Sequence, residues 1–291
     1  MNQPLVTVIC NCYNHEKFVT EALLSVINQS YKNIELIVVN NGSIDDSLAK
    51  ITTFLATNKN VKFINLTETL SHTKTFNLAF KQATGDYLID LSGDDALLPH
   101  TVETQLRFFK TQDTALVFGN AFTIDDNGEI LNTYFTTDYN KKVFDKELFN
   151  TNYQRLLNSG VVMCSAAAMF TTKHFKLLNG FNEKLFFEDL DYWLRLSHQY
   201  KIVFIDEVIM QKRVVISSLG NQFFKKNSVA QKINSSLRII YKEAINRNTP
   251  KENKILLKRI HYSMDKSWQA KNFSELFKFT CLEVWCRLKC F

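Results

Sequence analysis

Residues 5–15 read Leu-Val-Thr-Val-Ile-Cys-Asn-Cys-Tyr-Asn-His, an apolar run of strand length that passes directly into a polar stretch. The next segment, residues 16–29, carries apolar side chains at helical spacing, namely Phe18, Ala22, Leu23, Val26 and Ile27. This order predicts a buried strand, a loop and an amphipathic helix at the start of the chain.

The same alternation continues after this opening unit. Apolar runs at 34–39, 61–65 and 87–91 predict three further strands, and 73–83 predicts a helix between the last two. Ser43 is expected to cap a helix whose first turn contains Asp45 and Asp46. Apolar strands separated by helices indicate an α/β protein with a parallel sheet covered on both faces. Ligands of such sheets bind beyond the carboxyl ends of the strands, which here are followed by the loops 11–15, 40–43 and 92–95.

After residue 100 the expected helices and strands alternate less regularly, and from about residue 221 only helices are expected. Its expected elements are a helix at 101–112, a strand at 115–118, a turn at 125–128, a helix at 186–200, a strand at 201–205 and helices from about 221 to the end. Asn248-Thr249-Pro250 is expected to break the last region into two parts.

Composition limits the class of protein. The 291 residues are 45% hydrophobic and include 3 prolines and 8 glycines, which suits a large buried core and excludes a disordered chain. No apolar run reaches the length that spans a bilayer, and no secretory signal is visible. Six cysteines without dense spacing favour reduced thiols, so a cytoplasmic location is expected.

The net charge of +6 is unevenly distributed. Residues 221–291 hold 15 Lys and Arg against 5 Asp and Glu, whereas residues 1–220 hold 20 basic and 24 acidic groups. The positive charge therefore belongs to the C-terminal region. No nucleic-acid-binding module accompanies it, so no nucleic-acid partner is expected.

Ser92-Gly93-Asp94-Asp95 is the candidate site for chemistry, because it places two adjacent carboxylates at the end of a buried strand. Such a pair is costly unless a cation or strong hydrogen-bond donors offset the repulsion. Mg²⁺ and Mn²⁺ prefer oxygen ligands together with substrate phosphates, which predicts a metal–diphosphate site. The alternative, equally supported by the local sequence, is a helix N-cap before Leu97-Leu98-Pro99.

Four segments in this order resemble glycosyltransferase family 2. They are residues 6–14, residues 29–43, the stretch from Asn77 and residues 83–88 to the 92–95 loop, and residues 179–183 with 187–196. The resemblance extends over residues 4–213. It implies a GT-A fold, which is Rossmann-like with a mostly parallel central sheet flanked by helices, and a helical C-terminal tail outside the match. It also implies a glycosyltransferase domain at 1–220, with a nucleotide-sugar half of about 1–100 and an acceptor half of about 101–220. The composition adds a basic, aromatic-rich helical region at 221–291, which the resemblance does not cover.

The resemblance also implies roles for individual residues on the donor side. Asn11 and Tyr13 would lie against the nucleotide base. Asn40 and Asn41 occupy positions where the family usually has an acidic residue that contacts the base edge. Lys74 would neutralise the diphosphate, although a solvated helix lysine is as well supported.

On the metal and acceptor sides, Asp94 would contact the ribose or the metal, and Asp95 would ligate Mn²⁺ or Mg²⁺ directly. Asp189 would be the general base of an inverting displacement, and Glu188 would contact the acceptor. The alternative for Glu188 and Asp189 is an acidic first turn of a helix.

Several departures from the family pattern support a second hypothesis. The family often has Asp at the position of Ser92 and His at that of Val215. A catalytically silent nucleotide-sugar-binding or interaction protein on the same fold is therefore the alternative. A nucleotidyltransferase is disfavoured, because residues 11–15 lack glycine.

The expected enzyme is a non-processive hexosyl- or N-acetylhexosaminyl-transferase in bacterial surface polysaccharide or glycolipid assembly. Its expected partners are a UDP-sugar donor and a glycan or lipid-linked acceptor. The C-terminal tail combines aromatic and basic residues, which suits peripheral contact with the inner face of the cell membrane. The alternative for the tail is a helical cap that packs on the core.

Overall fold

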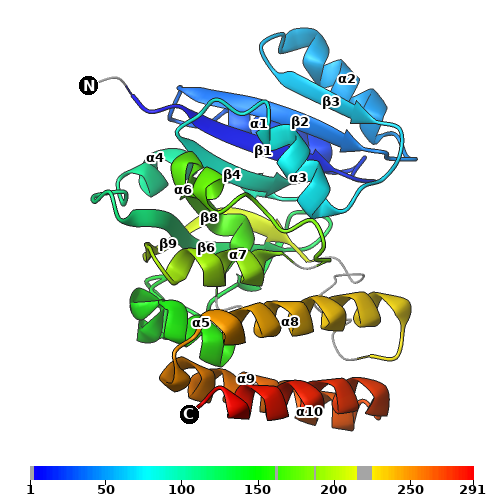
Figure 1. Cartoon of the computed structure of the whole chain (residues 1–291). Helices are drawn as coiled ribbons and strands as arrows, with labels where there is room; N and C mark the ends of the chain where they lie inside the picture. Colours follow the sequence, from blue (N-terminus) through cyan, green and yellow to red (C-terminus); the bar gives the residue numbers. More distant parts are fainter. Residues whose placement is uncertain (1–2, 161–162, 187, 215–224) are drawn as a thin grey trace. The chain divides into compact units, whose positions relative to one another are not determined.

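The computed structural model describes residues 3–160, 163–186, 188–214 and 225–291, and the chain divides into two compact units (Figure 1). The sheet unit consists of residues 1–150, 163–181 and 200–215, and the helical unit consists of residues 151–162, 182–199 and 216–291. Each unit is described by itself below. The expected domain boundary at residue 220 stays a prediction.

The described part of the sheet unit contains one sheet of nine strands. They are β1 (Val6–Cys12), β2 (Ile34–Asn41), β3 (Lys62–Leu66), β4 (Tyr87–Ser92), β5 (Ala96–Leu97), β6 (Thr114–Ile124), β7 (Ile130–Thr133), β8 (Ala168–Thr171) and β9 (Lys201–Arg213). Their order is β3-β2-β1-β4-β8-β6-β9-β5, and β7 pairs with β6. The first four strands are parallel neighbours, as their apolar runs predict.

Beyond β4 the sheet is mixed. Strand β8 runs antiparallel to both β4 and β6, β9 runs parallel to β6, and β5 runs antiparallel to β9. The short strand β5 corrects one expectation, because a helix N-cap was the alternative for the acidic loop before Leu97. Ala96 and Leu97 instead pair with Gln211 and Met210, so the acidic loop connects two strands.

The helices of the sheet unit are α1 (Val19–Ile27), α2 (Ser47–Thr57), α3 (His72–Phe80), α4 (Thr101–Leu106) and α6 (Thr172–Leu177), with two short 3₁₀ helices, η1 (Lys146–Asn150) and η2 (Ser165–Ala167). The prediction that Ser43 caps α2 is wrong, because Asp46 occupies the N-cap position. The Ser43 hydroxyl instead accepts a hydrogen bond from the Asn14 backbone at 3.1 Å. It thereby joins the loop after β2 to the loop after β1.

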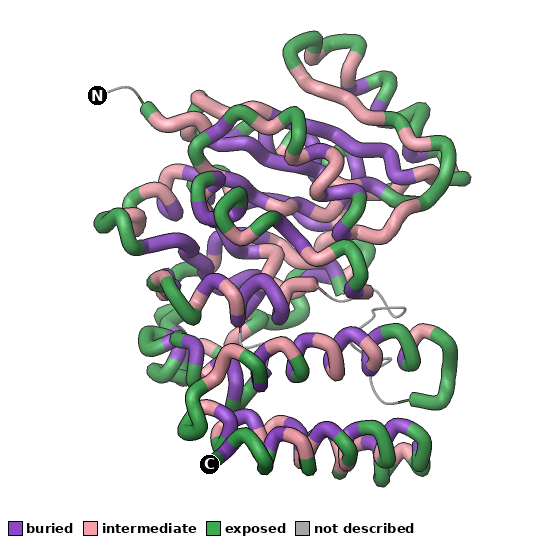
Figure 2. The backbone as a smooth tube through the Cα atoms, in the orientation of Figure 1, coloured by how far each residue is buried: buried purple, intermediate pink, exposed green. Residues whose placement is uncertain are grey.

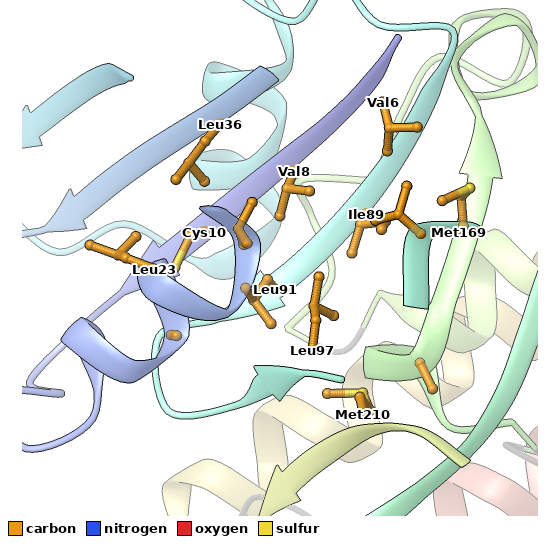
Figure 3. Packing of buried hydrophobic residues seen from close by; sticks show 14 of the residues in the cluster. Val6, Val8, Cys10, Leu23, Leu36, Ile89, Leu91, Leu97, Met169 and Met210 are labelled. Atoms are coloured by element: carbon orange, nitrogen blue, oxygen red, sulfur yellow. The ribbon is translucent and has the colours of Figure 1, made fainter. Parts of the chain in front are cut away.

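One hydrophobic cluster of the sheet unit lies against the strands on the side that α1 covers. Figure 3 shows Val6, Val8 and Cys10 on one face of β1, close to Leu91 of β4 and Leu23 of α1. All of these side chains are fully buried. Burial of a Val or Leu side chain contributes about 1.5–3 kcal/mol each, so this face of the sheet supplies much of the folding free energy.

The helical unit consists of α5 (Tyr153–Ser159), α7 (Asp189–Ser197), α8 (Ser228–Arg247), α9 (Pro250–Gln269) and α10 (Phe273–Leu288). The predicted break at residues 248–250 is confirmed. Thr249 and Glu252 form a capping box there, and Pro250 is the first residue of α9. A second break separates α9 from α10, where Lys271 has φ +52 and Asn272 caps α10. The pattern Asn-x-x-Glu at 272–275 is the sequence signal for this second helix start.

Within the described ranges, none of the helices combines the length and the apolar character that crossing a bilayer requires.

Candidate functional site

The carboxyl ends of β1, β2 and β4 meet at one edge of the sheet. In the strand register, Asn11 of β1 lies opposite Ser92 of β4, and Cys12 lies opposite Asn40 of β2. The three loops that the sequence analysis selected therefore leave the sheet side by side. This edge is the candidate donor site.

The acidic loop begins with a tight passage through Gly93. A Cβ atom at this position would lie 2.9 Å from His15 Nδ1 and 3.2 Å from the Cys12 Cα, so only glycine fits without a shift. The next residue, Asp94, accepts a hydrogen bond from the Ser92 hydroxyl, and its Oδ2 lies 3.8 Å from His15 Nε2. The Asp94 side chain is 15% exposed, so part of its carboxylate faces solvent.

Asp95 has a different environment from its neighbour, since it is only 3% exposed. Its Oδ1 accepts the Arg213 backbone N–H at 2.8 Å, and its Oδ2 lies 3.9 Å from Lys212 Nζ. Burial raises the pKa of Asp95 to about 6, and repulsion from Asp94 adds to this effect, while Lys212 and Arg213 oppose it. The Asp95 carboxylate thus interacts with Arg213 and Lys212 of the protein itself.

The Arg213 side chain holds the acidic loop in place. Its Nε donates to the Asp94 carbonyl at 3.0 Å, and its Nη2 donates to Glu21 Oε2 at 2.8 Å. Nη1 donates to the carbonyl of Asp125, and the guanidinium lies 4.2 Å from the centre of the Phe18 ring. The guanidinium is 1% exposed, so it links strand β9, helix α1 and the hairpin turn around the acidic loop. Sequence analysis did not find this role of Arg213.

Val215, where the family often has a metal-side His, lies outside the described residues, as do Phe187 and the tail residues Phe223 and Phe224.

Asn40 and Asn41 are buried and engaged by internal hydrogen bonds. The Asn40 amide donates to Asn65 at 2.8 Å and its oxygen accepts from the Ser43 backbone at 3.3 Å. The Asn41 amide donates to the Leu70 carbonyl at 3.0 Å and its oxygen accepts from the Leu70 N–H at 2.9 Å. Both residues are at most 4% exposed. They fix the loops after β2 and β3, and contact with a base edge stays a prediction for them.

Asn11 belongs to a chain of side-chain hydrogen bonds that sequence analysis did not find. The Asn11 amide lies 3.0 Å from His72 Nδ1, and His72 Nε2 lies 2.7 Å from Asp90 Oδ2. His72 is thus partnered at both ring nitrogens while its side chain stays 36% exposed. Since the Asn11 NH₂ can only donate, His72 Nδ1 accepts and Nε2 donates to Asp90. This arrangement fixes the orientation of the Asn11 side chain at the sheet edge.

Two further donor-side candidates are exposed. Tyr13 follows β1 and is 43% exposed, so its ring is available to a ligand. Lys74 lies in the first turn of α3, where its side chain is exposed and its backbone N–H lies 3.4 Å from the capping Ser71 hydroxyl. Roles in base and diphosphate binding stay predictions for these two residues.

Two distant segments of the family pattern meet in the sheet unit. Asn77 of α3 donates to the Phe181 carbonyl at 2.8 Å and accepts from the Phe181 N–H at 3.1 Å. Gly180 adopts φ +68 beside it, and a Cβ there would lie 2.8 Å from Asn77 Oδ1. This contact explains why Asn77 and the Asn179-Gly180-Phe181 turn occur together in one pattern.

Asp94 offers a metal a partly exposed carboxylate at this edge. Among the described residues, no group of three or more His, Cys, Asp and Glu side chains is arranged to hold a metal ion. Mg²⁺ and related ions often bind through one or two carboxylates and complete their coordination with substrate phosphates and water. Asp94 fits that kind of site, whereas the carboxylate of Asp95 is occupied by Arg213 and Lys212.

Glu188 and Asp189 belong to the helical unit and are therefore described apart from the donor edge. Glu188 is the N-cap residue of α7, and Asp189 is the first residue of the helix. Asp189 Oδ1 accepts the Leu190 N–H at 2.8 Å. Two residues on, Asp191 is 1% exposed and pairs with Arg195 at 2.7 Å, which secures the start of the helix. An acidic first turn is thus present, and the catalytic roles of Glu188 and Asp189 stay predictions.

Comparison with known proteins gives a consistent result. The model of the family described as Glycosyl transferase family 2 matches residues 7–176. An uncharacterized glycosyltransferase of Methanocaldococcus jannaschii is 29% identical over 222 residues, which are 74% of this chain and 72% of that protein.

Solved structures show the same fold. Residues 1–349 of S. aureus TarS in complex with UDP-GlcNAc give a TM-score of 0.66 at 18% identity, over 87% of this chain and 71% of that one. Mannosyltransferase PcManGT from Pyrobaculum calidifontis in complex with GDP-Man and Mn²⁺ gives 0.65 at 16% identity, over 98% and 76%. The α/β prediction and the GT-A fold are confirmed.

Proposed function

This chain belongs to glycosyl transferase family 2, and we propose that it is an inverting enzyme that moves one sugar at a time from a nucleotide-diphosphate sugar to an acceptor hydroxyl. The observation that carries the proposal is the edge formed by β1, β2 and β4, where Asp94 is partly exposed within a loop that Arg213 fixes. Ligands of α/β sheets bind at such an edge.

The donor would be held by residues of the sheet unit. Asn11 and Tyr13 would contact the nucleotide, and Lys74 would offer a positive charge to the diphosphate. Asp94 would hold a divalent cation, which when bound stabilises the negative charge of a departing diphosphate. Asp95 would act as a positioning residue, because its carboxylate is bonded to Arg213 and lies beside Lys212.

The acceptor would be activated from the helical unit. Asp189 would remove the proton from the acceptor hydroxyl as that oxygen attacks the anomeric carbon and the bond to the diphosphate breaks. Glu188 would orient the acceptor. A single displacement of this kind inverts the configuration at the anomeric carbon, and its transition state has oxocarbenium character.

The relatives suggest which donor to test first. TarS was solved with UDP-GlcNAc and PcManGT with GDP-Man and Mn²⁺, so a UDP-sugar or GDP-sugar with Mn²⁺ or Mg²⁺ is the class to test first. With either nucleotide, the transferred sugar would be a hexose or an N-acetylhexosamine. We propose bacterial surface polysaccharide or glycolipid assembly at the cytoplasmic face of a membrane as the setting.

A silent binding protein on the same fold is the second candidate. It is favoured by Ser92, which stands where the family often has Asp, and by Asn40 and Asn41, whose amides are engaged inside the protein. Such a protein would bind a nucleotide sugar and would neither hydrolyse nor transfer it.

The test combines two variants with transfer and binding assays. With UDP-GlcNAc and GDP-mannose as donors and Mn²⁺ present, we expect Asp189→Asn to lower donor turnover by at least about 100-fold, as loss of a general base does. Its thermal stabilisation by UDP with Mn²⁺ should stay at the wild-type level. Asp94→Asn should lose both turnover and most of that stabilisation.

Asp126→Asn is the matched control, because Asp126 is an exposed residue of the 125–128 turn and should behave as wild type. Wild-type turnover by Asp189→Asn would refute the base assignment. Binding without any turnover by the unmodified protein would favour the silent candidate.

A further inference from the structure

Helix α10 exposes an apolar stripe along its whole length. Phe273, Phe277, Val284 and Leu288 are 58%, 69%, 52% and 71% exposed, and the exposed Cys281 fills the position between them. Their spacing of four, four, three and four residues places them on one face of the helix. Trp268 at the end of α9 is 63% exposed, and its ring lies 5.7 Å from that of Phe273, so it extends the stripe.

The opposite face of α10 is packed inside the helical unit. Phe279 and Cys286 are fully buried, Leu282 is 8% exposed and Glu275 is 3% exposed. Helix α10 lies beside α9 and also contacts α8 (Figure 1). Figure 2 shows buried and exposed segments alternating along the tube of α10. The outward face of a surface helix is normally polar. An apolar outward face therefore indicates an interaction surface.

A groove between α8 and α10 borders this stripe. It has a volume of about 460 Å³ and is lined by Ser235, Arg238, Ile239, Lys242, Lys278, Cys281, Leu282 and Trp285. Cys281 belongs to both the groove and the stripe. Lys242 Nζ lies 5.8 Å from the centre of the Trp285 ring. None of the described residues that line the groove is acidic, so it combines apolar walls with three basic side chains.

The acidic groups of α10 are neutralised from within the unit. Glu275 pairs with Arg238 and with Lys278, the latter at 2.9 Å. Glu283 pairs with His261 at 2.9 Å and Arg287 at 2.7 Å. The segment 225–291 keeps its excess of 15 basic over 5 acidic residues. The stripe therefore belongs to a segment with a net positive charge.

We propose that the outer face of α10 docks on the surface of a bilayer that contains anionic phospholipids. The stripe from Phe273 to Leu288 inserts at the boundary between headgroups and acyl chains, and the exposed groove residue Lys242 faces lipid phosphates. A second copy of this chain is a poorer occupant, because it would bring two basic surfaces together. Docking and packing thus use opposite faces of one helix.

This inference names the surface through which the protein would contact the membrane, and its biological purpose rests on the proposed function. Its test uses lipid alone, without donor or acceptor. A failure to bind lipid would leave the transferase proposal standing, and a failure of transfer would leave the lipid result standing.

The test is flotation of the full chain with vesicles of phosphatidylcholine that contain about 30% phosphatidylglycerol. We expect the wild type to bind these vesicles and to bind pure phosphatidylcholine vesicles at least about tenfold less. The double variant Phe277→Ser with Leu288→Ser should bind the anionic vesicles at least about tenfold less than the wild type, because it removes two inserted apolar side chains.

Ile130→Ser with Leu131→Ser is the matched control. These two residues of β7 are 55% and 58% exposed, so the control also removes two exposed apolar side chains, at a different place, and should bind as the wild type does. Lys242→Gln should weaken binding about fivefold at low salt, whereas Lys254→Gln on α9 should not. Thermal unfolding of each variant verifies that the helical unit is intact.

Equal binding by the stripe variant and its control would overturn the proposal. So would equal binding to neutral and anionic vesicles, or light scattering that shows a dimer lost in the stripe variant while no vesicles are bound.

Discussion

The donor edge of the sheet unit and the outer face of α10 are both candidate binding surfaces. They differ in whether their side chains are bonded to other parts of the protein or left exposed. At the donor edge, the side chains of Asn41, Asp95 and Arg213 are bonded to other parts of the same unit. On α10, Phe277 and Leu288 are left exposed. A site for a small charged ligand is preorganised by such internal bonds, because reorganisation at the moment of binding would weaken it. A surface for an extended partner needs only a continuous apolar face with suitable charge around it.

The largest expected effect comes from making the same substitution in both units. Arg213→Met should lower the free energy of unfolding by about 2–4 kcal/mol, because it leaves the carbonyl oxygens of Asp94 and Asp125 without the donor that a buried guanidinium supplies. Arg287→Met should cost less than about 1 kcal/mol, since the Arg287 side chain is 58% exposed in its pair with Glu283. Urea denaturation of the two variants measures both values.

The same Arg213→Met variant should lose donor turnover even where it is folded, because the acidic loop loses its anchor. Conservative Arg213→Lys should recover only part of the stability, since an ammonium group cannot make the spread of contacts that the guanidinium makes. Equal costs for Arg213→Met and Arg287→Met would remove the distinction between an internally bonded edge and a solvated helix surface.

A second comparison concerns the pH dependence of a buried carboxylate in the sheet unit. Burial by itself would raise the pKa of Glu35, but hydrogen bonds from Lys62, Thr7 and Thr84 hold it below the usual value. A depressed carboxyl pKa contributes stability above the unfolded-state pKa, about 4.5, and that contribution is lost as the pH falls through the folded-state pKa. Glu35→Gln should therefore cost about 2 kcal/mol at pH 7 and much less at pH 3.

Denaturant unfolding of wild type and Glu35→Gln at the two pH values tests this. A difference that stays constant from pH 7 to pH 3 would show that the charge of Glu35 contributes nothing beyond its neutral hydrogen bonds.

The sequence predicts the first half of the fold better than the second, for a physical reason. Most residues of β1 and β2 and half of those of β4 are buried, so these strands appear as apolar runs, and the observed bounds of all four strands, the partly exposed edge strand β3 included, lie close to the expected ones. Strand β9 was expected to end at residue 205 but continues to Arg213 through polar residues, because its pairing with β6 sustains it. A pairing between distant segments leaves no local pattern in the sequence.

The same limit applies to the candidate site. Asp94 and Asp95 are neighbours in the sequence, and local pattern cannot distinguish their environments. The distinction is made by Arg213, which lies 118 residues beyond Asp95 and whose backbone N–H binds that carboxylate. The pairing of His72 with Asp90 was likewise missed, since the two residues come from a helix start and a strand. The adjacency of the three loops, by contrast, follows from the rule for parallel sheets and needed no coordinates.

The smallest expected effect tests a local helix cap in the helical unit. Thr249 accepts the Glu252 N–H at 3.3 Å, and Glu252 accepts the Thr249 N–H at 2.8 Å. Thr249→Ala should lower the free energy of unfolding by about 1 kcal/mol, whereas Thr249→Ser should keep most of it, because a serine hydroxyl can cap in the same way. Thermal unfolding of both variants gives the difference. If Thr249→Ala lost as much stability as Arg213→Met, α9 would depend on one cap as strongly as the acidic loop depends on one guanidinium. The two units would then differ only in the exposed apolar face of α10.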